Sequence, residues 1–346
     1  MARTALMTGI TGQDGSYLAE LLVQKKYRVV GLVRNSTASQ SRNIAHLHNQ
    51  IDFIFGNLND SASIYTAIQK AQPDEIYNLA SQSYPSHSWE LSLETAEVNG
   101  LGAHRLFDVV RQLKPDCKIY QASSSEMYGD TNVFPQNEST PFNPINPYAA
   151  AKLYAHNIAK IYRKSYNMFI SCGILFNHES PKRPPHFVCQ KITYAAACLK
   201  LGIENSPLFN EYGEPLVKNN QLTLGNLDIK RDWGFAGDYV EAMWLMLQHK
   251  TPEDFVIGTG QMHSLREICE IAFSHVGLNW KNYIKSDPRF IRPTETNTTV
   301  ADAAKAKQLL NWTPKVTFSE LIKTMVDSHL IHLKSQVTHV QSVISE

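Results

Sequence analysis

The sequence predicts an α/β fold in which a doubly wound parallel sheet is joined to a smaller, mixed α/β C-terminal lobe. Short apolar runs alternate with helical patterns through the first half of the chain, as in successive βαβ units. Runs such as residues 28–33 lack strict two-residue alternation, which is expected of strands covered on both faces. The chain has 346 residues, so we expect one large unit or two closely packed lobes.

The first half is predicted to hold six strands with helices between them. β-branched and apolar runs predict strands at residues 5–8, 28–33, 51–55, 75–79, 118–122 and 169–175. Helical periodicity predicts helices at residues 16–26, 61–71, 95–113 and 148–166. This order of elements is typical of a sheet with helices on both faces.

The second half changes character after a polar, turn-rich stretch at residues 202–221. A helix is predicted at residues 238–247 and a strand at residues 254–257. Ser264 and Glu267 have the spacing of a capping box, which predicts a further helix. Asp302 and Ser319 are predicted to cap two final helices, and the polar residues 334–346 are predicted to form a frayed tail.

The composition narrows the class of protein. Thirty-three Lys and Arg residues balance 32 Asp and Glu residues, so nucleic acid is not expected as a partner. No run of eighteen apolar residues and no charged leader before the first strand are present, so we expect a cytoplasmic protein without a membrane partner. The five cysteines are widely spread and are expected as buried free thiols, and no metal site is predicted.

A glycine-rich turn at residues 9–15 lies directly between the first strand and the first helix. Its Gly-x-x-Gly-x-x-Gly spacing permits a tight turn and lets backbone N–H groups approach a pyrophosphate. A plain glycine-rich turn is the alternative, but the position at the first βα connection favours a Rossmann-type dinucleotide site. Arg34 follows the second strand, where a guanidinium would pair with a ribose 2′-phosphate and favour NADP over NAD. A surface arginine in a loop is the other interpretation.

Tyr148 and Lys152 are four residues apart, so a helix places both on one side. A neighbouring ammonium favours phenolate, which makes Tyr148 a candidate base for a hydroxyl proton. Because the chain also carries a dinucleotide-binding glycine turn at residues 9–15, this pair predicts a short-chain dehydrogenase/reductase site. The alternative is a tyrosine that packs in the core and a lysine that is solvated. Ser124 and Glu126 follow the fifth strand and are expected in the same crevice, where Glu126 could move a carbon-bound proton. Taken alone, Glu126 could equally be a charge at a helix start.

Seven segments in order then show a family resemblance: residues 9–15, 121–129, 148–152, 176–181, 225–233, 238–244 and 292–295. Together they resemble the GDP-mannose 4,6-dehydratases of the extended short-chain dehydrogenase/reductase family, from about residue 4 to 330. Ser124 stands where that family usually has Thr, Asn35 replaces an Arg and Asn57 replaces an Asp. Residues 184–186 and the longer segment 202–221 also depart from the family pattern.

The resemblance implies a set of site residues. The catalytic ones would be Ser124, Glu126, Tyr148 and Lys152. The NADP contacts would be Gly9, Ile10, Thr11, Gly12, Gln13, Asp14, Arg34, Asn35, Ser36, Thr37, Asn57, Leu58, Leu79, Ala80, Ser81, Gln82, Ser83, Tyr148, Lys152, His178 and Arg183. The substrate contacts would be Asn177, Val188, Lys191, Arg231 and Arg292, the arginines facing a diphosphate.

The implied activity is that of a lyase that converts GDP-D-mannose to its 4-keto-6-deoxy form. The domains would be an NADP-binding domain at residues 1–176, a mainly substrate-binding lobe at 177–333 with some segments returning to the first domain, and the tail at 334–346. Rival functions are the same reaction on another sugar such as GDP-N-acetylglucosamine, a 4-epimerase without use for Glu126, or a non-catalytic NADP sensor. A homodimer or homotetramer is expected, with residues 36–49 as a candidate contact.

Overall fold

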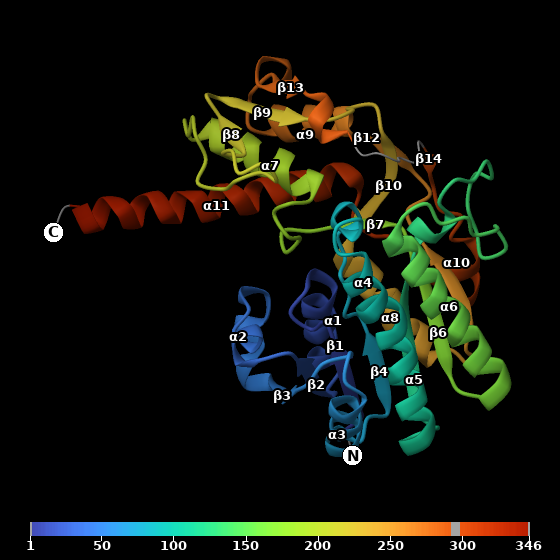
Figure 1. The fold of residues 1–346 in the computed structure, drawn as a ribbon. Helices are drawn as coiled ribbons and strands as arrows, with labels where there is room; N and C mark the ends of the chain where they lie inside the picture. The colour runs from blue at the N-terminus through green and yellow to red at the C-terminus, as the bar shows by residue number, and fades with distance from the viewer. Residues whose placement is uncertain (1, 292–297, 345–346) are drawn as a thin grey trace. The chain divides into compact units, whose positions relative to one another are not determined.

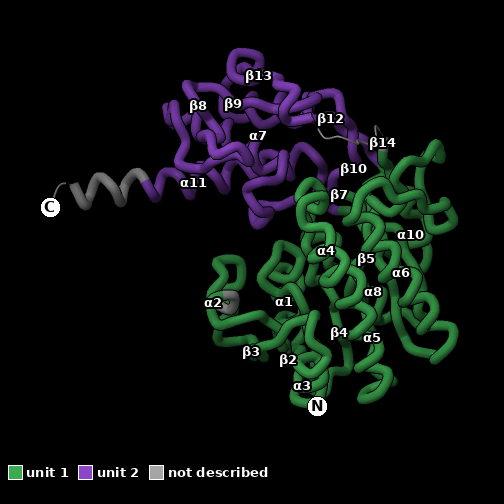
Figure 2. Tube along the Cα trace, in the orientation of Figure 1, with its two compact units in different colours: residues 1–178, 236–260, 299–314 green, residues 179–235, 261–298, 315–346 purple. Residues whose placement is uncertain are grey.

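The computed structural model describes residues 2–291 and 298–344. Its elements are labelled in Figure 1, and Figure 2 shows the division of the chain into two compact units. Unit 1 consists of Met1–His178, Ala236–Gly260 and Thr299–Pro314, and unit 2 of Glu179–Phe235, Gln261–Thr298 and Lys315–Glu346. The chain first leaves unit 1 two residues after the predicted boundary at residue 176, and two later segments return to it.

A seven-stranded parallel sheet forms the centre of unit 1, in the order β11-β6-β5-β4-β1-β2-β3. Its strands are β1 (Thr4–Thr8), β2 (Arg28–Val33), β3 (Ile51–Phe55), β4 (Glu75–Asn78), β5 (Lys118–Ser124), β6 (Ile170–Leu175) and β11 (Asp254–Ile257). The order reverses direction at β1, next to β4, which is where a doubly wound sheet binds ligands. The predicted fold class is therefore confirmed.

Helices cover both faces of this sheet. Side chains of β1 alternate between two cores, because Met7 packs with Leu18 and Met243 whereas Leu6 packs with Ile64 and Phe107. The α-helices of unit 1 are α1 (Gln13–Gln24), α2 (Ser36–Ser39), α3 (Ser61–Ala71), α4 (Ser92–Thr95), α5 (Gly102–Leu113), α6 (Pro147–Tyr166), α8 (Ala236–Gln248) and α10 (Ala304–Leu310). Its short helices are η1 (Arg42–Gln50), η2 (Pro85–Ser88), η3 (Ala96–Leu101) and η4 (Ser125–Tyr128).

Unit 2 has its own apolar core, formed by three helices and short strands. Its helices are α7 (Val188–Lys200), α9 (Leu265–His275), α11 (Phe318–Ile344), η5 (Trp280–Asn282) and η6 (Pro288–Phe290). The strands β8 (Val217–Lys218), β9 (Gln221–Leu224) and β13 (Ile284–Ser286) form one sheet, and β10 (Lys230–Phe235) pairs with β12 (Met262–Ser264). The strands β7 (Asn177–Glu179) and β14 (Thr298–Thr299) lie where the chain passes between units.

Several predicted element boundaries are corrected by the structure. The predicted capping box of Ser264 and Glu267 is present at the start of α9. The next helix, α10, begins at Ala304, and Asp302 accepts a hydrogen bond from the Ala304 N–H at 3.1 Å. Ser319 does not cap α11, because Thr317 and Glu320 form reciprocal bonds there instead. The helix α11 continues to Ile344 where a frayed tail was predicted, since extending a helix adds one backbone bond per residue without a new nucleus.

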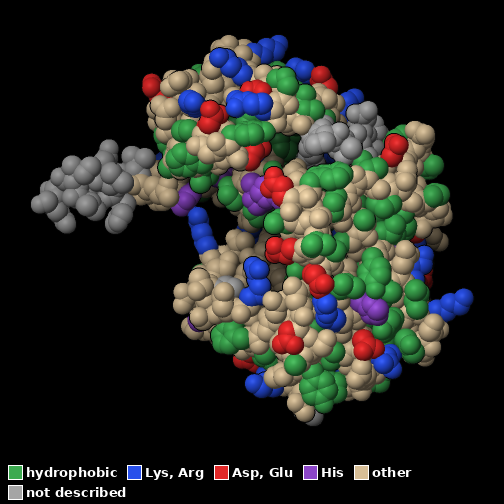
Figure 3. Space-filling view, viewed as in Figure 1, with side chains coloured by type: hydrophobic (Ala, Val, Ile, Leu, Met, Phe, Trp, Pro, Cys, Tyr) green, Lys and Arg blue, Asp and Glu red, His purple; other side chains and the backbone are tan. Residues whose placement is uncertain are grey.

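The predicted helix at 95–113 contains a π-helical stretch, η3, before α5 begins at Gly102. All five cysteines are buried and unpaired, as predicted. On the face drawn in Figure 3, Lys and Arg side chains are interspersed with Asp and Glu rather than gathered in one patch. Among the described residues, no helix is long and apolar enough to cross a membrane.

Candidate active site

The glycine turn forms a cradle between β1 and the N-terminus of α1. Gly9 has a φ of +70°, and a Cβ there would lie 2.7 Å from the backbone nitrogen of Ala80. A Cβ on Gly15 would lie 2.2 Å from the carbonyl oxygen of Gly9, so both positions require glycine. Gly12 is the N-cap of α1 and has no side chain that could occupy the helix end. The cradle therefore fits a pyrophosphate held by backbone N–H groups.

A buried polar chain fixes the second wall of the cradle. The Thr8 hydroxyl accepts hydrogen bonds from the Leu79 and Ala80 N–H groups, both at 3.0 Å, and donates to Asn78 at 2.7 Å. The Asn78 amide in turn donates to Gln121 at 2.8 Å, which links β4 to β5. The site prediction did not include Thr8 or Asn78. Their signal in the sequence is a polar residue at the end of an otherwise apolar strand.

The predicted adenosine-side residues follow β2 and β3. Arg34 is exposed, and within the described part of the chain its guanidinium has no ion-pair or hydrogen-bond partner. Asn35 follows it, and Ser36 and Thr37 open α2. The backbone N–H of Asn57 donates to Ser63 at 2.9 Å, and the Leu58 side chain is buried. Because parallel strands end at the same edge, these residues and the cradle share one edge of the sheet.

The Tyr148 and Lys152 pair lies on the first turns of α6, which Asn146 caps. Both side chains are buried, and the Lys152 ammonium lies 5.8 Å from the centroid of the Tyr148 ring. The Lys152 ammonium donates to the carbonyl oxygen of Ala122 at 2.9 Å. Burial lowers the pKa of Lys152 to about 8, because desolvation disfavours the charged form. The pair is thus held against β5, the strand that leads to the other two predicted catalytic residues.

Ser124 and Glu126 lie where β5 ends in η4. The Ser124 hydroxyl accepts from the Glu126 N–H at 3.2 Å, and the Glu126 carboxylate accepts from the Asn146 amide at 3.1 Å. Asn146 immediately precedes α6, so one chain of contacts joins Ser124 and Glu126 to the helix that bears Tyr148 and Lys152. Sequence reasoning missed Asn146, although its position before Pro147 marks it as a helix cap.

His178 joins the cradle from the end of unit 1. Its Nε2 lies 2.9 Å from the Asp14 carboxylate and its Nδ1 lies 2.7 Å from the Phe176 carbonyl oxygen. The ring stacks on Tyr239 with centroids 4.7 Å apart, and its backbone carbonyl accepts from Gln13 at 3.1 Å. The structure therefore brings His178 next to the predicted NADP residues of the first turn. Asn177 precedes it in β7.

Most of the predicted substrate residues lie in unit 2. Val188 begins α7, and Arg183, a predicted NADP contact, also lies in unit 2, where its guanidinium stacks over the Phe187 ring at 3.5 Å. On the same helix, Lys191 is nearly buried and bonds to Glu211 at 2.6 Å. Arg231 is buried on β10 and donates to the carbonyl oxygen of Lys230 at 2.8 Å. Arg292 lies outside the described residues.

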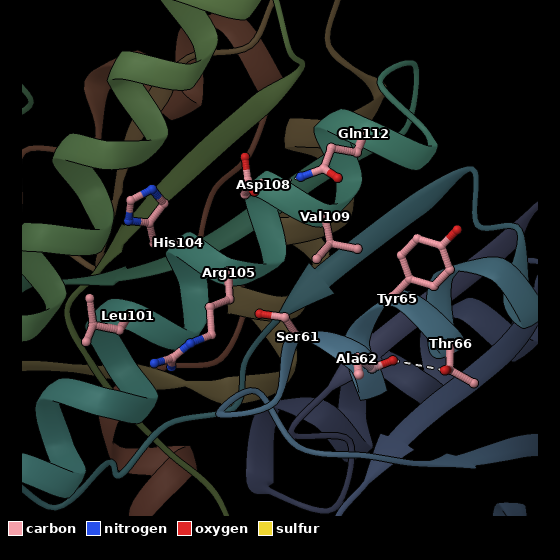
Figure 4. Close-up of a pocket in the computed structure, with 10 residues that line it drawn as sticks. All are labelled: Ser61, Ala62, Tyr65, Thr66, Leu101, His104, Arg105, Asp108, Val109 and Gln112. Carbon is pink, nitrogen blue, oxygen red and sulfur yellow. Dashed lines mark hydrogen bonds between the residues drawn. The ribbon is translucent and has the colours of Figure 1, made fainter.

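A surface pocket of unit 1 contains none of the predicted site residues. Figure 4 shows that it lies between α3 and α5, and its charged side chains already have partners. Arg105 pairs with Glu97 at 2.7 Å, and Asp108 pairs with Arg111 at 2.9 Å. His104 bonds to the Tyr154 hydroxyl at 2.8 Å. Because its charged side chains are engaged and no predicted site residue lines it, the pocket is not our candidate site.

A second cluster joins His156, Cys172 and Asp254 in the core of unit 1, with potential ligand atoms within 4.8 Å of one another. The Arg163 guanidinium lies 2.5 Å from the Asp254 carboxylate and 3.8 Å from the Cys172 sulfur. A metal ion here would face this fixed positive charge at close range. We interpret the cluster as an ion-paired part of the core.

Comparison with known proteins places these features in a family. The family model described as GDP-mannose 4,6 dehydratase matches residues 6–325. The chain is 45% identical over 340 residues to "GDP-mannose 4,6 dehydratase 1" of Arabidopsis thaliana, covering 95% of this chain and 90% of that relative. It is also 45% identical over 349 residues to the GDP-mannose 4,6 dehydratase of Homo sapiens, covering 93% and 90%.

Solved structures support the fold. The UDP-glucose 4-epimerase of Thermotoga maritima matches with a TM-score of 0.81 at 22% identity, covering 95% of this chain and 99% of that one. The dTDP-glucose 4,6-dehydratase of Bacillus anthracis, solved with NAD, matches with a TM-score of 0.79 at 21% identity, covering 95% and 96%. The protein RMD of Pseudomonas aeruginosa, solved with NADPH, matches with a TM-score of 0.77 at 20% identity, covering 95% and 99%. The family model and the sequence relatives, each spanning nearly the whole chain, show that this protein belongs to the GDP-mannose 4,6-dehydratase family.

Proposed function

We propose that the protein is an NADP-dependent hydro-lyase that converts GDP-D-mannose to GDP-4-dehydro-6-deoxy-D-mannose. The observation that carries the proposal is the placement of Glu126 in one chain of contacts with Ser124 and with the helix that bears Tyr148 and Lys152. An oxidoreductase that only moves a hydride needs no carbon acid–base group beside its tyrosine. A dehydratase needs one to remove a proton from C5.

Each residue has one task in the proposed reaction. Tyr148 takes the proton of the C4 hydroxyl, Ser124 donates a hydrogen bond to O4, and Lys152 favours the phenolate form of Tyr148. A nicotinamide dinucleotide held by the glycine turn at residues 9–15 would supply the hydride acceptor for C4 and the hydride donor for C6. Between these events Glu126 removes the C5 proton, which the C4 ketone has acidified, and the C6 hydroxyl leaves as water with one proton. A proton then returns to C5, so the net change is the loss of one water.

NADP is the proposed cofactor because Arg34 directly follows β2 and, within the part of the chain that the structure describes, its guanidinium has no partner. Structural neighbours are solved with NAD or with NADPH, which supports a nicotinamide cofactor in general. The glycine turn at the N-terminus of α1 supplies backbone N–H groups of the kind that bind a pyrophosphate. On the substrate side, Arg231 and Arg292 are proposed to bind the diphosphate of the GDP-sugar.

A panel assay tests the proposed function. The pure protein is incubated with NADP and with GDP-, UDP-, CDP- and dTDP-sugars, and products are analysed by mass spectrometry for the loss of one water. We expect GDP-mannose to be dehydrated fastest, and Tyr148→Phe to abolish turnover. Faster turnover of dTDP-glucose, or epimerisation without loss of water, would contradict the proposal.

We further propose a homodimer or homotetramer in the cytoplasm. The segment that follows Arg34 is the proposed subunit contact. It supports an interface because it is long for a connection between two strands of the sheet and holds only the short α-helix α2 and the 3₁₀ helix η1. Sedimentation velocity at micromolar concentration should show an oligomer. A strictly monomeric protein in this experiment would exclude the proposed homodimer or homotetramer.

A further inference from the structure

We propose that Asn146 is a positioning residue that directs the Glu126 carboxylate toward the substrate and ties it to the helix bearing Tyr148. This inference rests on the proposed function, because it assigns to Asn146 the orientation of the base that acts at C5. Asn146 is not among the site residues that the sequence predicts. The proposal follows from two hydrogen bonds made by one side chain.

The Asn146 side chain uses both ends of its amide. Its oxygen accepts from the backbone N–H of Ala149 at 2.8 Å, and its nitrogen donates to Oε2 of Glu126 at 3.1 Å. Turning the amide over would place oxygen against carboxylate and N–H against N–H, and both contacts would repel. The orientation of the amide is therefore determined by its partners.

The backbone of Glu126 is held independently of Asn146. Its N–H donates to the Ser124 hydroxyl at 3.2 Å, and its carbonyl oxygen accepts from the Gly129 N–H at 3.1 Å. The side chain of Glu126 has rotatable bonds of its own, and among the described residues its only hydrogen bond is to Asn146. Asn146 thus selects the direction of a carboxylate whose backbone is already fixed. The second carboxylate oxygen is left for the substrate.

The arrangement suits a reaction on two neighbouring carbons. Tyr148 acts at the C4 hydroxyl and Glu126 acts at C5, so the two groups must keep a constant separation during turnover. Asn146 precedes Tyr148 by two residues, and its backbone carbonyl also accepts from Ala150 at 3.0 Å in the first turn of α6. A neutral amide cannot take up the proton that Glu126 removes, so it orients the base without competing with it.

Asn146→Ser separates this role from simple helix capping. Serine is as good an N-cap as asparagine, but its hydroxyl is too short to serve Ala149 and Glu126 together. We expect an unchanged unfolding temperature, a similar KM and a kcat lower by about 10-fold to 100-fold, the usual effect of losing a hydrogen bond to a charged group. Reduced nicotinamide should accumulate, because hydride transfer from C4, with Tyr148 as the base, proceeds while removal of the C5 proton is slowed.

Two further variants sharpen the test. Asn146→Asp keeps the acceptor for Ala149 but places a second carboxylate against Glu126, so its kcat should fall below that of Asn146→Ser. Asn279→Ser is the matched control, because Asn279 caps η5 in unit 2 by accepting from Lys281 at 3.2 Å. It should show wild-type kcat and no accumulation of reduced nicotinamide.

The outcomes distinguish this inference from the proposed function. A wild type that dehydrates GDP-mannose, together with an Asn146→Ser variant of unchanged kcat, would overturn the positioning role alone. A kcat that falls only in proportion to lost folded protein would also overturn it. A wild type that removes water from no GDP-sugar would overturn both the proposed function and the inference.

Discussion

Glu211 accepts a hydrogen bond from the ammonium of Lys191 at 2.6 Å. Glu211 lies in the segment 202–221, which is longer than in the family pattern, so this segment contacts a predicted substrate residue of unit 2. The next residue, Tyr212, donates to the carbonyl oxygen of Arg289 at 2.5 Å and packs edge-on against Phe290. These contacts attach the segment to the chain just before Arg292. The long segment is therefore part of the predicted substrate side rather than a detached surface loop.

Glu211→Gln should lower the KM for GDP-mannose by about 3-fold to 10-fold, because the Lys191 ammonium would no longer be engaged by a carboxylate and could bind the substrate. Steady-state kinetics at constant ionic strength measure this change. Glu214→Gln is the control, because Glu214 pairs with Lys218 in the same segment. A higher KM in the Glu211 variant would show that the carboxylate itself helps to bind the substrate.

Glu126→Gln should stop water loss while the first half-reaction continues. Tyr148 and Lys152 are intact in this variant, so C4 oxidation still reduces the cofactor, and the absorbance of reduced nicotinamide should rise once and persist. The amide has nearly the same size but cannot accept the C5 proton. Glu94→Gln, an exposed position on α4, is the control. Full dehydratase turnover by Glu126→Gln would remove this residue from the mechanism.

Arg34→Asp should weaken NADP binding by at least about 10-fold and leave NAD binding unchanged or stronger, because a carboxylate repels a 2′-phosphate and accepts from a 2′-hydroxyl. Calorimetry with both cofactors measures the two dissociation constants. Arg28→Gln, at the other end of β2 and paired with Asp52 on the surface, is the control. If the wild-type protein binds NAD more tightly than NADP, the assignment of Arg34 fails.

Lys152→Met should abolish activity yet increase the free energy of unfolding at pH 7 by about 1 to 3 kcal/mol. Burial lowers the pKa of Lys152 from 10.5 to about 8, so below pH 8 the folded protein carries a charge that it disfavours. Between pH 8 and 10.5 the unfolded chain binds more protons, so wild-type stability rises with pH in that window. Urea unfolding should show that the difference in free energy of unfolding between Lys152→Met and the wild type becomes smaller as the pH rises through this window. Lys160→Met, at an exposed position on the same helix, is the control.

His156→Gln should flatten the dependence of stability on pH between about 4 and 6.5. Burial lowers the pKa of His156 to about 4, so the folded state excludes a proton that the unfolded chain binds in this range. Wild-type stability is therefore expected to fall by about 3 kcal/mol as the pH drops from 6.5 to 4. Glutamine can still bond to the Ser123 hydroxyl, which lies 3.0 Å from His156 Nδ1. An equal slope in wild type and variant, with exposed His48→Gln as control, would contradict the prediction.

The sequence by itself determined the features that depend on neighbours along the chain. The glycine turn at 9–15 and the Tyr148–Lys152 spacing each lie within a few residues, where local geometry alone places their atoms. The strands β2, β3 and β11 and the helix α3 have the predicted bounds, because apolar runs and helical periodicity report which faces are buried. Family segments spread along the chain then connected these local motifs to one type of reaction.

Only the tertiary structure decided the contacts between distant segments. Asn146 and Glu126 are twenty residues apart, as are Lys191 and Glu211, and Thr8 bonds to a residue seventy positions away. Polar residues such as these carry no periodic signal, because their partners depend on how strands and helices pack rather than on local propensity. The same limit explains the missed π-helical stretch before Gly102, where a side chain of Leu58 would lie 3.0 Å from an added Cβ. Packing at close range selects such details, and a linear pattern of apolar residues cannot encode them.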